Sequence, residues 1–263
     1  MSLSLVQSRA LLGLEAASVT VEVHLANGLP SFSLVGLADV EGKEARERVR
    51  CAIQNAGLAF PNNKRITVNL APADLPKDSG RFDLPIALGI LASSGQIDAA
   101  RLAGWEFAGE LSLSGELRAV RGALAMSLAL HASQVVTRLV LPPGSAEEAA
   151  LVPTAQVYRA GHLLDVVQQF LPESDTTLAE VPQGGATSGV GWSRLSTMPM
   201  AAIEAYPDLA DVKGQAAAKR AMEIAAAGGH SLLMSGPPGS GKSMLAQRFA
   251  GLLPAMTVDE ALQ

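Results

Sequence analysis

The chain has 263 residues, of which 48% are hydrophobic and 17% are charged. This length is enough for two compact units with separate cores, and the low charge content excludes a disordered, highly charged tail. The formal net charge of −5 gives no general attraction to nucleic acid or to anionic membranes, so either contact would need a local basic patch.

Three features bear on the expected cellular location: disulfides, a signal peptide and membrane spans. A single cysteine, Cys51, excludes an intramolecular disulfide and fits a reducing compartment. The N-terminus lacks a basic start followed by a long apolar run, so we expect it to form a strand and not a signal peptide. No stretch has the roughly 18 consecutive apolar residues of a membrane span. We therefore expect a cytoplasmic protein with no membrane partner.

Residues 1–171 have the pattern of one α/β unit. Alternating apolar and polar residues, or short apolar runs, predict strands over 19–25, 32–35, 65–70, 138–141 and 156–159, and a hairpin over 111–117. Apolar residues at helical spacing predict helices over 40–56, 84–94, 122–133 and 162–171.

Residues 172–200 change in composition. They are rich in Pro, Gly, Ser and Thr and show no periodicity, which is typical of a flexible linker. Trp192 is the one aromatic residue in this stretch, and it could dock on a neighbouring surface.

A second unit is predicted over residues 201–263. An alanine-rich helix is expected over 213–227, a short buried strand over 230–235 and another helix over 241–253. A strand, a glycine-rich loop and a helix in this order form the first part of a nucleotide-binding α/β domain.

The glycine-rich loop fits the pattern G-x-x-x-x-G-K-[ST] at every fixed position. Its residues are Gly236, Pro237, Pro238, Gly239, Ser240, Gly241, Lys242 and Ser243. In such loops backbone N–H groups face phosphate oxygens, the lysine reaches the β- and γ-phosphates, and the hydroxyl binds Mg²⁺. The alternative is a chance glycine turn, but the predicted strand before the loop and the helix after it favour a phosphate-binding loop for ATP with Mg²⁺.

No residue is assigned a catalytic role. Hydrolysis needs a second acidic strand that holds Mg²⁺ and polarises water, and usually an arginine from a neighbouring subunit. Asp259 and Glu260 lie near the end of the chain, but no hydrophobic strand precedes them. We therefore expect no ATP turnover from these 263 residues alone.

Long, ordered stretches resemble the ComM/YifB branch of the magnesium-chelatase-like AAA+ ATPases. They are NGLPSFSLVGLAD (27–39), EARERVRCAIQNAG (44–57), RITVNLAPADLPKDSGRFDLPIALGIL (65–91), GELSLSGELRAVRGAL (109–124) and DLADVKGQAAAKRAMEIAAAGGH (208–230), together with the phosphate loop. The resemblance covers essentially the whole chain; Ser231 departs from it, since the family usually has Asn there.

The resemblance implies a fold and a function. Residues 1–171 would be a ribosomal-S5-domain-2-like, Lon-protease-like α+β domain, and 201–263 the incomplete start of a P-loop AAA+ α/β domain whose segment 208–215 lines the adenine pocket. The full-length protein would be a hexameric, ATP-dependent DNA helicase that promotes branch migration in recombination and natural transformation. The DNA partner enters only through this resemblance.

The Lon-like resemblance raises the alternative of a Ser–Lys protease. The position of the serine in those proteases falls on Arg81, and the position of the lysine falls on Leu124. Lys77 and Ser79 are close together in one loop, which is not the arrangement of that family. We therefore expect a domain without protease activity.

Two further alternatives stay open. The first is a magnesium-chelatase-type ATPase that remodels a protein partner, although the N-terminal domain argues against it because chelatase ATPase subunits begin close to the AAA+ module. The second is a truncated interaction module without enzyme activity.

Basic residues flank the strand over 65–70 and the loop after it. Lys64, Arg65, Lys77 and Arg81 could contact phosphates. They could equally be ordinary surface charges paired with Asp74, Asp78 and Asp83, which is the interpretation we favour because the cluster has mixed sign.

Overall fold

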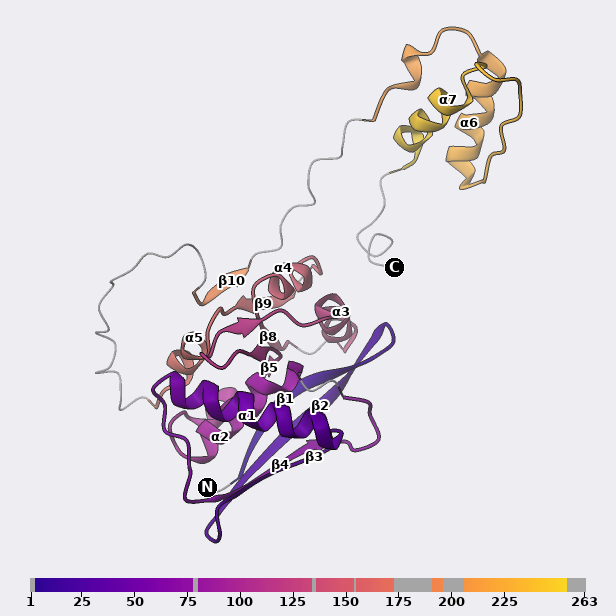
Figure 1. Cartoon of the computed structure of the whole chain (residues 1–263). Coiled ribbons are helices and arrows are strands. Elements are labelled where there is room, and N and C mark those ends of the chain that lie inside the picture. Colours follow the sequence, from indigo (N-terminus) through magenta and orange to yellow (C-terminus); the bar gives the residue numbers. More distant parts are fainter. Residues whose placement is uncertain are drawn as a thin grey trace. The chain divides into compact units, whose positions relative to one another are not determined.

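The computed structural model describes residues 3–77, 80–133, 136–153, 155–172, 191–195 and 206–254. The chain divides into two compact units, Met1–Met198 and Pro199–Gln263, which are described separately (Figure 1). Among the described residues, no helix combines the length and apolar character needed to cross a membrane.

The first unit is built on an eight-stranded mixed sheet with the strand order β10-β9-β8-β5-β1-β2-β4-β3. Its strands are β1 (Leu3–Leu12), β2 (Glu15–Ala26), β3 (Ser31–Val35), β4 (Arg65–Ala71), β5 (Trp105–Phe107), β8 (Arg138–Leu141), β9 (Gln156–Arg159) and β10 (Ser193–Leu195). A separate hairpin pairs β6 (Glu110–Leu111) with β7 (Leu117–Arg118), where the sequence predicts one. The predicted α/β class is confirmed.

The long strands of this sheet follow the alternation in their sequence. β1 pairs with β2, and β2 with β4, in antiparallel register, whereas β3 runs parallel to β4. Along β2, Val19, Val21 and Val23 are fully buried, while the residues between them face the other side of the sheet.

Helices lie on both faces of the sheet, although one face is left partly exposed at β1, where Leu3 and Leu5 are 53% and 52% exposed. The helices are α1 (Asp39–Asn55), α2 (Asp83–Ser93), α3 (Ala123–Ser133), α4 (Ser145–Ala149) and α5 (Leu163–Val167), with short 3₁₀ turns η1 (Gly80–Phe82), η2 (Ala99–Leu102) and η3 (Gln168–Phe170). α1, α2 and α5 contribute to the larger core cluster, and α3 and α4 contribute to a second cluster. In β8 the alternation separates the two, since Val140 belongs to the first cluster and Leu139 and Leu141 to the second.

β5 is a central strand that the sequence analysis does not predict. It has only three residues and lies between β1 and β8. Arg9 of β1 and Glu106 of β5 form a buried ion pair, with Nε 2.7 Å from Oε2, and Arg9 also donates to the carbonyl of Ala16. This pair links β1 to β5, where the antiparallel strands β1, β2 and β4 meet the parallel strands β5, β8 and β9.

The described part of the expected linker belongs to the first unit. Residues Ser193–Leu195 form β10, which pairs antiparallel with β9. The Trp192 ring lies 5.6 Å from that of Trp105 and 5.2 Å from that of Tyr158, centroid to centroid, and Phe170 completes this aromatic cluster. Residues 173–190 and 196–205 of the expected linker and of the start of the second unit lie outside the described residues.

The second unit contains two helices and two 3₁₀ turns, all within residues 206–254. They are η5 (Leu209–Asp211), α6 (Ala216–Gly228), α7 (Lys242–Phe249) and η6 (Ala250–Leu252). The strand predicted over 230–235 is wrong, because these residues carry no strand assignment. The described part of this unit contains no strand. The backbone N–H and C=O groups of residues 230–235 therefore have no neighbouring strand with which to form ladder hydrogen bonds.

Candidate functional site

The glycine-rich loop of the second unit lies between the segment 231–235 and α7. Gly239 has φ +80° and Gly241 has φ +85°, in the left-handed region that favours glycine. Gly241 is the residue that caps the N-terminus of α7, so the chain turns sharply there and enters the helix at Lys242.

Lys242 folds back over this loop. Its Nζ donates to the carbonyl oxygens of Gly236 at 2.8 Å and Pro237 at 2.9 Å, and it lies 3.3 Å from Oγ of Ser240. The ammonium is thus held inside the curve of the loop, next to the N-terminus of α7. Ser243, the second residue of α7, has an exposed side chain.

The start of α7 has the features of an anion site. The first N–H groups of any α-helix have no partner within the helix, and the helix dipole adds partial positive charge there. No side chain caps this end of α7, and its first turn has no acidic residue. Together with the Lys242 ammonium and the exposed Ser243 hydroxyl, these features fit a phosphate group and its Mg²⁺ ion.

Neighbouring residues hold the loop against α6 and η5. Gln215, which adopts φ +56°, donates from Nε2 to the Ser240 carbonyl at 3.0 Å. Arg248 donates from Nε to the carbonyl of Asp208 at 3.0 Å and so ties α7 to η5. The sequence analysis does not identify Arg248, since nothing in its spacing shows that it reaches across 40 residues.

A cavity of about 350 Å³ adjoins the loop. Its walls come from α6, the segment 232–237 and α7, and they include Gln215, Leu232, Pro237 and Lys242. Leu209, Val212, Met222 and Leu245 form a small core among the described residues of this unit, and Leu245 also lines the cavity. The structure therefore brings the predicted loop residues together with part of the predicted adenine-pocket segment 208–215.

Other predicted residues are placed differently. Asp259, Glu260, Asp78 and Ser79 lie outside the described residues. Lys77 is buried and donates to the carbonyls of Pro72 and Leu75.

Arg81 is buried in the first unit, and it donates to the carbonyl of Arg121 at 3.1 Å. Lys77 and Arg81 therefore do not share a solvent-facing basic patch with Lys64 and Arg65. Both the phosphate-contact hypothesis and the favoured interpretation as surface charges are wrong for Lys77 and Arg81. Both side chains are buried, and their charged groups donate to backbone carbonyls.

Asp83 forms its ion pair with Arg48, not with Lys64, Arg65, Lys77 or Arg81. It is fully buried at the start of α2, where Oδ2 accepts from Nε of Arg48 at 2.7 Å and from the N–H of Leu111 at 3.2 Å. Burial raises the pKa of Asp83 to about 7, although the hydrogen bonds from Arg48 and Leu111 act in the opposite direction. Asp83 therefore belongs to the interior of the first unit, not to its surface.

Two family models match the chain. One, described as subunit ChlI of Mg-chelatase, matches residues 21–145 of the first unit. The other, described as magnesium chelatase, subunit ChlI, matches residues 208–263 of the second. Because the first unit also matches a model with this description, the presence of that unit no longer argues against a chelatase-type role.

Curated relatives match the chain from end to end. It is 50% identical over 264 aligned residues to the competence protein ComM of Haemophilus influenzae, covering 100% of this chain and 49% of that protein. It is 45% identical to the uncharacterized protein YifB of Salmonella typhimurium and 44% identical to YifB of Escherichia coli, covering 100% of this chain and 48% of each relative. The chain therefore spans about half the length of the curated relatives it matches.

Proposed function

Because this chain belongs to the ComM/YifB family of magnesium-chelatase-like proteins, we propose that its second unit binds ATP with Mg²⁺ through residues 236–243. The observation that carries this proposal is the N-terminus of α7, which has no side-chain cap, with the Lys242 ammonium beside it. When bound, ATP supplies the free energy of phosphoryl transfer. Lys242 would hold the β- and γ-phosphates, and Ser243 would ligate the metal ion.

The longer protein would be a motor that acts on DNA. We propose a hexameric, ATP-dependent helicase that promotes branch migration during recombination and natural transformation. Support comes from the 50% identity to a protein named for competence and from the family resemblance of the whole chain. The remaining half of such a protein would supply the acidic strand and the arginine that hydrolysis requires.

A second candidate is an ATPase of the magnesium-chelatase type that remodels a protein partner. The descriptions of both family models favour it, and the same phosphate loop would serve it. The two candidates differ in what stimulates ATP turnover, which is DNA in the first case and a protein partner in the second. An interaction module without enzyme activity would show neither stimulation.

The first unit would be a Lon-like domain that has no protease activity. Arg81, at the position of the serine in Lon-type proteases, is buried and donates to backbone carbonyls. Leu124, at the position of the lysine, carries no ionisable group. These two residues would leave the fold in place without its nucleophile and base.

Lys242→Ala tests the nucleotide proposal. We expect a loss of ATP affinity of at least about 100-fold, since charge-assisted contacts to phosphate are among the strongest in such sites. Titration with a fluorescent ATP analogue measures it, and Arg220→Ala, an exposed change on α6, is the matched control. Equal affinity of the Lys242→Ala and control proteins would refute the site.

The function of the longer protein is tested by ATP turnover with and without DNA. We expect DNA to stimulate turnover, and Lys242→Ala to abolish it. If a protein fraction stimulates ATP turnover and DNA does not, the chelatase-type candidate is favoured.

A further inference from the structure

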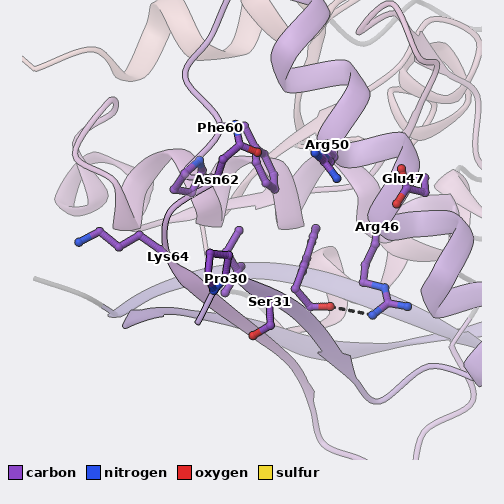
Figure 2. Close-up of a pocket in the computed structure, with 11 residues that line it drawn as sticks. Pro30, Ser31, Arg46, Glu47, Arg50, Phe60, Asn62 and Lys64 are labelled. Atoms are coloured by element: carbon purple, nitrogen blue, oxygen red, sulfur yellow. Dashed lines mark hydrogen bonds between the residues drawn. The ribbon is translucent and has the colours of Figure 1, made fainter. Parts of the chain in front are cut away.

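A pocket in the first unit is unrelated to the phosphate loop and lies between α1, β3 and the loop before β4 (Figure 2). Its volume is about 410 Å³, within the range of roughly 300–1,000 Å³ typical of ligand sites. Phe32 of β3 and Phe60 of the loop contribute apolar surface, with ring centroids 6.0 Å apart. Both rings are only half-buried, so a ligand can reach them.

Three cations surround these rings. Arg46 and Arg50 project from α1 at one end of the pocket, and Lys64 lies at the other end (Figure 2). Among the described residues, none of the three forms an ion pair with a carboxylate. Arg46 donates to the carbonyl of Phe32 at 2.7 Å, and Lys64 donates to Oδ1 of Asn27 at 2.6 Å, both of which are neutral acceptors.

The positive charge is therefore held in place but not neutralised. The Arg50 guanidinium lies 5.9 Å from the centroid of the Phe60 ring, so cation and ring form one combined surface. Glu47 also lines the pocket and is the one acidic residue there, which leaves an excess of positive charge in a chain whose net charge is −5.

A second cavity adjoins the first. Its volume is about 620 Å³, it shares Pro61 and Lys64 with the first, and it is lined by polar groups such as Asn63 and Ser94. A ligand that follows both cavities would be elongated, with Lys64 at the junction. Repeated negative charge and flat rings, alternating along one flexible chain, are the chemistry of a single-stranded nucleic acid.

We propose that this pocket binds single-stranded DNA, with phosphates at Arg50 and Lys64 and a base against Phe60. The inference deepens the proposed DNA function and rests on it. A duplex would not fit in the same way, because its bases are stacked inside and cannot contact the phenylalanine rings. Glu47, the acidic residue in the lining, would repel a phosphate.

The test measures binding of a fluorescein-labelled strand of about 20 nucleotides to the 263-residue chain by fluorescence anisotropy, between about 50 and 200 mM salt. Arg50→Gln and Lys64→Gln are each expected to weaken binding about 3–10-fold and to lower the salt slope by about 0.7. Lys43→Gln is the matched control, because Lys43 is exposed on the same helix, outside the pocket.

Two further variants separate ring contact from charge. Phe60→Leu keeps an apolar side chain beside Phe32 but removes the ring, and it is expected to weaken binding about 5-fold or more. Glu47→Gln is expected to tighten binding about 2–3-fold through the lost repulsion. Thermal unfolding of each variant shows whether it is folded, and the gain for Glu47→Gln cannot arise from misfolding.

The outcomes are distinct. If the pocket variants bind the strand as Lys43→Gln does, the pocket is refuted while binding of DNA elsewhere survives. If duplex and heparin bind as tightly and Phe60→Leu has no effect, the site is only a general polyanion site, which also overturns the inference. If the unmodified chain binds no strand, the inference fails, whereas the proposed function is judged separately by DNA-stimulated turnover of the longer protein.

Discussion

The two units of this chain differ in how completely they bury their apolar residues. In the first unit, both faces of the sheet carry helices, and side chains such as Ile53 and Leu88 are fully buried. Among the described residues of the second unit, the core cluster has four buried members, and Leu233 is 93% exposed. Leu233 lies in an apolar stretch of the kind that forms a buried strand in the first unit.

This difference shows what an apolar run requires to become a strand. β8 in the first unit is four residues long and is buried because β5 and β9 flank it. The segment 231–235 has a similar composition but no neighbouring strand among the described residues. Hydrogen-bond partners and a covering layer, not composition alone, therefore decide the outcome.

The sharpest test of the comparison makes one chemical change in both units. Leu88→Ala should destabilise the first unit by about 2–5 kcal/mol, since it leaves a cavity in a packed core. Leu233→Ala should change the stability of the second unit by less than about 0.5 kcal/mol.

Each unit has its own readout for this pair. Both tryptophans, Trp105 and Trp192, belong to the first unit, so their fluorescence during denaturant unfolding follows that unit. The stability of the second unit is measured by hydrogen exchange of its backbone amides. A large loss of stability for Leu233→Ala would show that this side chain is buried in solution, and the two units would then not differ in this respect.

Trp192 tests where the first unit ends. Trp192→Ala should destabilise it by about 2–3 kcal/mol, less than the roughly 3–5 kcal/mol of a fully buried tryptophan, because the ring is half-buried in the aromatic cluster. Trp192→Phe, which keeps a ring in place, should cost less than about 1.5 kcal/mol. If Trp192→Ala has no effect on denaturant unfolding, β10 contributes nothing to the first unit.

Asp83 predicts a pH dependence confined to the first unit. Its pKa is about 7 in the folded unit and near the ordinary value of 3.8 when unfolded, so between these values the folded state binds more protons. The free energy of unfolding should therefore fall as pH rises from about 4 to about 7, by up to about 1.4 kcal/mol per pH unit, and level off above.

Asp83→Asn isolates this contribution. The amide retains the shape of the side chain but cannot titrate, so the difference in slope between the two proteins belongs to Asp83. The absolute stability of the variant does not matter for this comparison. Equal slopes for both proteins would show that the pKa of Asp83 is not raised.

Local pattern accounts for much of what could be predicted. Periodicity predicts the strands over 19–25 and 65–70 and the helix α1. Each of these elements buries the side chains of one face, so apolar residues recur at regular spacing within one continuous segment. Spacing alone is enough to predict a phosphate-binding loop over residues 236–243, since its fixed glycines and Lys242 fall within eight consecutive residues. β5 was missed because three residues carry too little periodicity to be recognised.

The sequence by itself determined the α/β class and the family, and it predicts the phosphate loop, because all three depend on residues that are adjacent or regularly spaced. Only the tertiary structure decided that Arg81 and Asp83 are buried, and that Trp192 joins an aromatic cluster across β9 and β5. It also brought Arg50 to Phe60 and Lys64. The physical reason is that burial and charge pairing depend on partners distant in sequence, and chain folding alone brings those partners together.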